Sequence, residues 1–167
     1  MHQQLNTDQV ARIGELLKAR GETIAVAESS TGGLISASLL SVPGASAYFL
    51  GGSVVYTLLS RRELLKITAA DVEGLAPLSE PMVERFAIRA REQLDATWGI
   101  AELGAAGPSG ARYGHPAGTC VLAVSGRVTL TITVQTGSDD REANMWEFTA
   151  AAMSLMEEAL SSSRSET

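Results

Sequence analysis

The sequence predicts a single α/β domain, and three observations support that prediction. The first is the order helix, apolar strand, polar turn and helix over residues 7–40. The second is a pair of strands over residues 119–135, whose alternating character is typical of an antiparallel hairpin. The third is size, because 167 residues fit one domain that buries most of its apolar surface without disulfides or metals. Together they indicate helices packed on a β-sheet.

Helices and strands alternate through the first half of the chain. The first helix, over residues 7–20, has apolar residues at helical spacing, with Thr7 or Asp8 as its expected N-cap and Gly21 as its stop. Strands are predicted at residues 23–27 and 53–57. Shorter helices are predicted at residues 34–40, 60–66 and 69–75.

The second half begins with a well-marked helix. Ser79 is its expected N-cap and Pro81 lies in its first turn, and the helix runs to about Ala96. Residues 105–118 form a long loop with four glycines and two prolines, and such loops are usually functional or mobile. The other expected elements are strands at 100–104, 119–124 and 127–135, a helix at 142–160 and a fraying polar tail at 161–167.

Composition excludes some classes of protein. Hydrophobic residues make up 45% of the chain and charged residues 19%, which is ordinary for a globular domain and unlike a disordered one. The net charge of −6 has the wrong sign for binding a nucleic-acid backbone, which needs clustered Lys and Arg. We therefore expect no nucleic-acid partner, although a local basic pocket for one small anion stays open.

The rare residues indicate compartment and metal content. Cys120 is the single cysteine, so no intrachain disulfide can form. Residues 1–4 do not begin a signal peptide, and no apolar run approaches the ~18 residues of a membrane span. We expect a cytoplasmic protein without a membrane partner. With only His2 and His115 as further soft ligands, no metal site and no cofactor are expected.

Polar residues follow the first predicted strand and precede a helix. Ser29 at this turn lies beside the unpaired N–H groups of a helix start, which favour an anion or a developing oxyanion. The N–H groups near residues 30–32 are the expected oxyanion site. The alternative is that these residues only cap the helix. The candidates in this turn are Glu28, Ser29, Ser30, Thr31 and Gly32.

Three further places could carry chemistry. Tyr56 could reach a pocket from the end of its strand, or be a core residue with a solvated hydroxyl. Arg61 and Arg62 could bind a phosphate or carboxylate, or form a solvated helix face. Glycines in the long loop allow backbone N–H groups to approach a ligand, but an ordinary flexible loop with a solvated His115 is equally open. The loop candidates are Gly107, Pro108, Ser109 and Gly110.

Two other polar or reactive positions have simpler interpretations. Cys120 lies inside an apolar strand and is expected to be a small buried hydrophobe. Residues 139–142 are expected to cap the last helix. The apolar face of that helix could serve the core or a dimer interface, and it carries Met145, Phe148, Met153 and Met156.

Several blocks of sequence resemble, in order, the CinA C-terminal family. Ala27–Leu34 is similar to the family's A-E-S-C-T-G-G motif, with serine at the position of the cysteine. Gly107–Pro108 and Pro116–Thr119 are similar to its Gly-Pro loop and the strand that follows. The other similar blocks are Pro43–Phe49, Gly52–Tyr56, Leu64–Ile67, Leu78–Pro81 and Asp140–Arg141. The resemblance spans about residues 7–160.

The resemblance implies a single-domain, three-layer α/β/α sandwich with a mixed sheet, and a cytoplasmic homo-oligomer. It implies an amidohydrolase that converts nicotinamide mononucleotide to nicotinic acid mononucleotide and ammonia, so the expected partner is a pyridine nucleotide or a related phosphorylated amide. It implies Ser29 as nucleophile, with Tyr56 and the residue at position 61 assisting it. The turn candidates, the loop candidates and Arg141 would then contact substrate.

Three positions depart from the family pattern. Arg61 stands where the family has a lysine, and a guanidinium stays charged and cannot readily accept the proton of a serine. Leu103 replaces a serine or threonine. Met145 replaces an arginine suited to the substrate phosphate, which leaves Arg141 as the remaining phosphate partner.

Two interpretations of these departures stay open, because loss of a general base commonly costs ~10²–10⁴ in rate. In one, the protein remains an amidohydrolase with a divergent site, in which Tyr56, Glu28 or a bound water replaces the lysine. In the other, it is a catalytically silent paralogue that acts as a nucleotide-binding or partner module.

Overall fold

Five strands form one mixed sheet in the order β2-β1-β3-β4-β5. The computed structural model describes residues 5–164. The strands are β1 (Ile24–Glu28), β2 (Phe49–Val54), β3 (Trp98–Ala105), β4 (Thr119–Ser125) and β5 (Thr129–Gln135). β1 pairs in parallel with β2 and with β3, whereas β3, β4 and β5 pair antiparallel. The sheet is therefore parallel on one side of β3 and antiparallel on the other.

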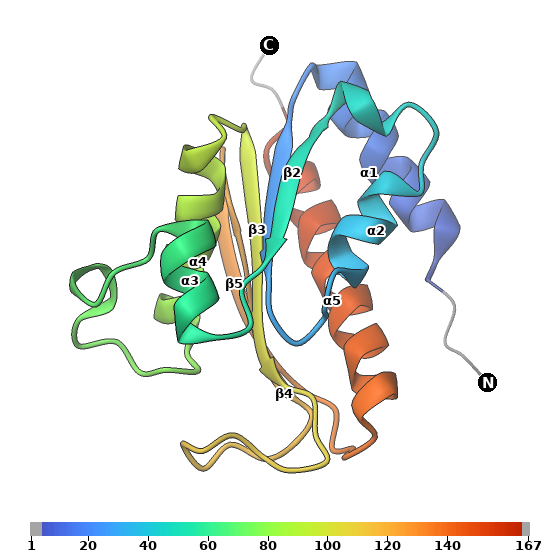
Figure 1. Ribbon diagram of the computed structural model, residues 1–167. Helices are drawn as coiled ribbons and strands as arrows, with labels where there is room; N and C mark the ends of the chain where they lie inside the picture. The colour runs from blue at the N-terminus through green and yellow to red at the C-terminus, as the bar shows by residue number, and fades with distance from the viewer. Residues whose placement is uncertain (1–4, 165–167) are drawn as a thin grey trace.

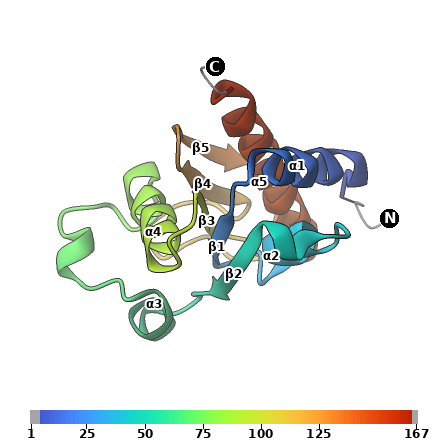
Figure 2. The same ribbon diagram turned by 90° about the horizontal axis from the view of Figure 1, so that it is seen from above.

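Helices cover both faces of this sheet, as Figures 1 and 2 show. They are α1 (Thr7–Arg20), α2 (Leu34–Leu40), α3 (Leu58–Leu65), α4 (Glu80–Gln93) and α5 (Arg141–Ser162), with short 3₁₀ turns η1 (Ala45–Ala47) and η2 (Ala70–Val72). α1, α2 and α5 lie on one face, and α3 and α4 on the other. This arrangement confirms the predicted three-layer α/β/α fold with a mixed sheet.

Alternate residues of the central strands enter two separate cores. Trp98 and Ile100 of β3 pack toward α1, α2 and α5, whereas Ala101 and Leu103 of β3 pack toward α4. Both faces of β3 are therefore buried, as expected for a strand covered by helices on each side.

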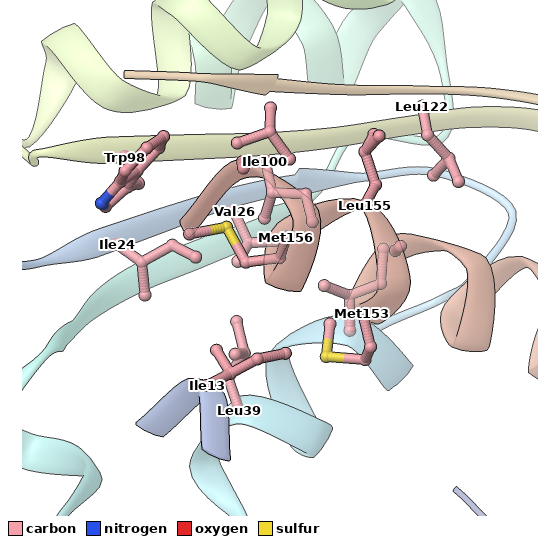
Figure 3. Packing of buried hydrophobic residues seen from close by; sticks show 14 of the residues in the cluster. Ile13, Ile24, Val26, Leu39, Trp98, Ile100, Leu122, Met153, Leu155 and Met156 are labelled. Atoms are coloured by element: carbon pink, nitrogen blue, oxygen red, sulfur yellow. The ribbon is translucent and has the colours of Figure 1, made fainter. Parts of the chain in front are cut away.

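The last helix contributes its apolar face to the larger core. Phe148, Met153 and Met156 are completely buried there, and Figure 3 shows Met156 facing Ile24 and Val26 of β1, with Met153 toward Leu39 of α2. Within this chain, then, that face belongs to the core. Cys120 is also buried in this core, which confirms its predicted role as a small hydrophobe, and burial raises the pKa of its thiol.

One strand lies earlier in the chain than predicted. β2 covers Phe49–Val54, so Tyr56 lies in the connection after it. The cause is local, because Thr57 and Ser60 form a capping box that starts α3. The Thr57 hydroxyl accepts from the Ser60 N–H at 3.1 Å, and the Ser60 hydroxyl accepts from the Thr57 N–H at 2.9 Å. A residue that caps a helix cannot also continue the strand.

A second correction concerns the first helix, whose N-cap is Asn6 and not Thr7 or Asp8. The Asn6 side chain accepts from the Gln9 N–H at 3.1 Å. The predicted stop, Gly21, is confirmed with a left-handed φ of 63°. The remaining elements begin and end within three residues of the predicted positions.

The connections reverse direction at β1. The chain passes from β1 through α2 to β2 on one side, and returns through α3 and α4 to β3 on the other side. In open α/β sheets, such a reversal leaves a crevice at the carboxyl ends of the strands, where ligands bind. The β1–α2 turn and the loop 106–118 both lie at that end, at the bottom of Figure 1.

Candidate active site

Glu28 ends β1 and organises the start of α2. Its Oε1 accepts from the N–H groups of Gly33 and Ile35 at 2.9 and 3.1 Å, and its Oε2 from the N–H of Ser36 at 3.0 Å. The hydroxyls of Thr31 and Ser36 add bonds of 2.6 and 2.8 Å. Because this carboxylate is completely buried and bonded within the chain, it caps α2 from inside and does not face a ligand space, contrary to its predicted contact with substrate.

A second carboxylate, from Glu102 of β3, lies on the other side of the same turn. Its Oε2 accepts from the N–H groups of Ser29 and Thr31 at 3.0 and 3.1 Å, and its Oε1 accepts from the Ser30 hydroxyl. Glu102 is completely buried. Burial raises the pKa of Glu102 above its usual range, although the hydrogen bonds from Ser30, Ser29 and Thr31 act in the opposite direction.

The predicted oxyanion site at residues 30–32 is therefore partly occupied by the protein itself. The Thr31 N–H is bonded to Glu102, and the Gly32 N–H donates to the Ser29 carbonyl at 3.1 Å. The expectation that these donors are open to substrate is wrong for both groups. For Thr31 the physical reason is that a buried N–H needs a partner, which Glu102 provides, whereas the exposed Gly32 bonds within the turn itself.

The two carboxylates compete for one hydroxyl. Thr31 Oγ1 lies 2.6 Å from Glu28 Oε1 and 3.0 Å from Glu102 Oε2, but a hydroxyl has a single proton to donate. Among residues 5–164, neither carboxylate takes part in an ion pair. For Glu102, burial without a paired cation favours proton uptake.

Gly104 makes room for the Ser30–Glu102 contact. A Cβ at this position would lie 2.6 Å from Ser30 Oγ, 2.8 Å from Cys120 Cβ and 2.9 Å from Glu102 Oε1. Gly104 also lines a small cavity of about 80 Å³ together with Arg61. The serine and the carboxylate thus contact a residue that borders open space.

Ser29, the predicted nucleophile, has no base in this arrangement. Its N–H is bonded to Glu102, and its hydroxyl donates to no side chain or carbonyl among residues 5–164. Ser29 and Ser30 are equally buried, each 5% exposed. The hydroxyl that has a proton acceptor is therefore that of Ser30.

Hydrogen bonds from Arg141 bring together Tyr56 and Gly107, two of the other predicted site residues. Arg141 Nη2 donates to the Tyr56 hydroxyl at 3.2 Å, and Arg141 Nη1 donates to the Gly107 carbonyl at 2.6 Å. Asp140, just before Arg141, is the N-cap of α5 and accepts from the Ala143 N–H at 3.1 Å. The start of α5 therefore holds both Tyr56, in the connection after β2, and Gly107 in the long loop.

The long loop is anchored at its base and exposed at its tip. Asn144 is completely buried, and its Nδ2 donates to the carbonyls of Ala106 and Ser138 at 2.8 and 2.9 Å. Its Oδ1 accepts from the Thr136 hydroxyl at 2.6 Å. Gly107 is buried and joined to its neighbour by a cis peptide bond. The remaining predicted contacts, Pro108, Ser109 and Gly110, are exposed.

Arg61 lies on the opposite face of the sheet from Glu102. Its Nε donates to the Val55 carbonyl at 3.3 Å, and its guanidinium lies over the Phe86 ring, 5.1 Å from the centroid. Burial lowers the pKa of Arg61, while the charges of Tyr113 and Glu102 act to raise it.

The other two departures from the family pattern are accommodated by packing. Leu103 is 1% exposed and belongs to the core beneath α4. Met145 approaches the β1–α2 turn, since a Cβ on Gly32 would lie 3.4 Å from its terminal methyl carbon. An apolar contact therefore occupies the place of the family's second arginine.

Sequence reasoning missed Glu102, although a signal was present. β3 alternates between two apolar cores, and Glu102 falls on the same face as Trp98 and Ile100. A carboxylate in a strand that is buried on both faces needs donors from elsewhere in the chain. The nearest polar cluster by topology is the turn that follows the neighbouring parallel strand β1.

Within residues 5–164, no helix has the length and apolar character to cross a bilayer. In the same range, no three side chains of His, Cys, Asp or Glu gather as a metal site would need.

Comparisons with known proteins show the family to which the chain belongs. The model of the CinA C-terminal domain family matches residues 6–160. A CinA-like protein of Acaryochloris marina is 46% identical over 114 residues, which are 68% of this chain and 27% of that protein. The chain thus spans about a quarter of the length of this curated relative.

Solved structures show the same fold. A CinA superfamily protein from Klebsiella pneumoniae superimposes with a TM-score of 0.87 at 29% identity, covering 95% of this chain and 99% of that one. A competence or damage-inducible protein from Enterobacter asburiae gives a TM-score of 0.86 at 26% identity, covering 94% and 99%. With the family model matched over most of its length, this chain belongs to the CinA C-terminal domain family.

Proposed function

We propose that the protein is an amidohydrolase resembling nicotinamide mononucleotide deamidase, in which Ser30 is the nucleophile and Glu102 is its proton acceptor. The observation that carries this proposal is the hydrogen bond from the Ser30 hydroxyl to the buried carboxylate of Glu102. A serine beside a general base is the usual arrangement of an activated nucleophile. Burial tunes carboxylates of this kind toward neutral pH, where they accept protons effectively.

The reaction follows from this pair. Ser30 Oγ attacks the carboxamide carbon while its proton passes to Glu102 Oε1. The tetrahedral intermediate then breaks its C–N bond, and Glu102 returns the proton to the departing ammonia. Water attacks the resulting Ser30 ester, giving a proton to Glu102, which passes it to Ser30 Oγ as the carboxylic acid leaves.

This assignment moves two roles relative to the family pattern. The nucleophile moves from Ser29 to Ser30, the position of the family's cysteine. The base moves from position 61 to β3, which allows Arg61 to replace a lysine without loss of a proton acceptor. Arg141, exposed at the rim and bonded to Tyr56, is the proposed partner of the substrate phosphate.

One observation favours a second candidate function. Glu28 and Glu102 together accept most of the donors of the β1–α2 turn, which is how an anion site is closed when it is no longer used. In that case the protein is a nucleotide-binding or partner module, and Glu102 only holds the turn.

The test is ammonia release from nicotinamide mononucleotide by the wild type and by Ser30→Ala, Glu102→Gln and Ser29→Ala. We expect Ser30→Ala and Glu102→Gln to lower the rate by ~10² or more, the usual cost of losing a base or its nucleophile. Ser29→Ala is the matched control and should stay within tenfold of wild type. Loss of activity in Ser29→Ala alone would return the nucleophile to Ser29. No release by wild type, with nucleotide binding retained in a thermal-shift assay, would establish the binding module.

A further inference from the structure

A second cavity lies on the α4 side of the sheet, away from the Ser30–Glu102 pair. Its volume is about 470 Å³, and it is lined by α3, α4, the segment between them and Tyr113 of the long loop. This volume is within the range of small-molecule sites. The walls are mainly apolar, with Ile67, Val72, Met82 and Phe86 among them, and Arg61 and Tyr113 supply polar groups.

Arg61 is a half-buried cation without an anionic partner. It forms no ion pair with a described residue, and of its guanidinium nitrogens only Nε donates, to the Val55 carbonyl. The N–H groups of Nη1 and Nη2 therefore have no acceptor among the described residues, and they lie in a largely apolar space. Burying a charge without a partner is costly, and a two-pronged anion is the ligand that best satisfies a guanidinium.

The neighbouring arginine shows the contrast. Arg62 also borders the cavity, but its side chain is 64% exposed and its Nε is paired with Glu63 at 2.8 Å. Solvent and Glu63 already satisfy that charge. The attraction for an anion is therefore specific to Arg61. The chain as a whole, with a net charge of −6, does not attract anions.

A flat apolar group would complete the cavity. The face of Phe86 is covered on one side by the Arg61 guanidinium, and Met82 and Val72 offer flexible or branched apolar contacts nearby. Arg61 and Tyr113 also line the smaller cavity that Gly104 borders, so the two cavities are neighbours.

We propose that this cavity is a binding site for a small aromatic anion, whose carboxylate or sulfonate binds Arg61 and whose ring packs against Phe86 and Met82. The proposed binding uses neither Ser30 nor Glu102, so it does not rest on the proposed amide hydrolysis.

The test compares two fluorescent probes that share one ring system. One is 1-anilinonaphthalene-8-sulfonate, and the other is N-phenyl-1-naphthylamine, which lacks the sulfonate. We expect wild type to bind the sulfonate probe at least ~10-fold more tightly than the neutral one, the smallest effect typical of a hydrogen bond to a charged group. Arg61→Met should abolish this preference by weakening only the sulfonate probe, and Arg62→Met should behave as wild type.

Folding of each variant is checked by circular dichroism, and Arg61→Gln replaces Arg61→Met if the latter does not fold. Equal affinity of wild type for both probes would overturn the proposal. So would sulfonate binding that survives loss of the Arg61 charge, or that falls equally in Arg62→Met. Ammonia release is not measured in this test, so its failure and that of the proposed hydrolase are separate results.

Discussion

At the scale of single residues, the Ser30–Glu102 contact depends on the absence of a side chain at position 104. Gly104 lies on the strand β3, two residues beyond Glu102, and any side chain there would enter the space that Ser30 Oγ and Glu102 Oε1 now share. A strand glycine that a close approach requires in this way is a sensitive position.

We therefore predict that Gly104→Ala lowers the free energy of unfolding by ~1–3 kcal/mol, the usual cost of overpacking a core. The added Cβ would lie 2.6–2.9 Å from three side-chain atoms. Gly51→Ala in β2 is the matched control, because its only close neighbour is the end of the Leu94 side chain at 3.0 Å, which is partly exposed and can move. Urea unfolding measures both, and equal stability of the two variants would contradict this account of Gly104.

The protonation of Glu102 gives a prediction for activity. Glu102 accepts a proton only when it is ionised, and burial raises its pKa above the usual range. The plot of kcat/KM against pH should therefore have a rising limb. The apparent pKa of that limb should lie above the ordinary glutamate value of about 4.3. Glu102→Gln should lack that limb. A limb at the ordinary value in wild type would show that Glu102 is not the group that titrates.

At the scale of elements, helix α5 positions the long loop. Asn144 bonds to Ala106, Ser138 and Thr136, and three residues earlier Arg141 bonds to Gly107 and Tyr56. The base of the loop is thus held by a helix that is itself anchored in the core.

Asn144→Ala should destabilise the protein by ~1–3 kcal/mol or more, because it removes the donor to the buried Ala106 carbonyl and to the part-buried Ser138 carbonyl. The matched comparison is Asn6→Ala, which removes the N-cap of α1 and should cost ~1 kcal/mol. Urea unfolding at one pH measures both. A loss for Asn144→Ala no larger than that for Asn6→Ala would contradict the role given to Asn144.

Element order was predictable from the sequence because helices and hairpins depend on local patterns. The alternation in 127–135 and the caps at Ser79 and Asp140 each predicted the right element. β2 was misplaced because a capping box at Thr57 ends the strand region earlier than the apolar pattern suggests. The site itself was harder, since Ser30 and Glu102 are 72 residues apart and no local pattern joins them.

At the scale of the whole molecule, the fold brings two carboxylates to one turn, and stability should depend on pH as a result. The pKa of Glu102 is raised in the folded state, so the folded protein keeps a proton that the unfolded chain releases. Its contribution to stability is therefore present at low pH and lost as pH rises from about 4 through the folded-state pKa, by at most about 1.4 kcal/mol per pH unit.

The difference in unfolding free energy between wild type and Glu102→Gln isolates this contribution, since the other titrating groups are common to both proteins. That difference should fall with rising pH and then level off. Urea unfolding between about pH 4.5 and 8, where the native fold is first verified by circular dichroism, measures it. A difference that grows with pH would mean that Glu102 has a lowered pKa.

The fold class was recognisable because the family's sequence blocks follow the same order as the elements that carry them. The same resemblance assigned the nucleophile to Ser29, since the family motif places it there. We propose Ser30 instead, because its hydroxyl donates to Glu102, whereas only the N–H of Ser29 does so.

The measurement that tests the central claim most directly is the identity of the serine that becomes acylated. The protein would be treated with p-nitrophenyl acetate, quenched in acid and digested, and the peptide covering the β1–α2 turn sequenced by mass spectrometry. We predict an acetyl group on Ser30 in wild type and in Ser29→Ala, and none in Glu102→Gln. An acetyl group on Ser29, or labelling of Ser30 that does not depend on Glu102, would contradict the Ser30–Glu102 pair as the reactive unit.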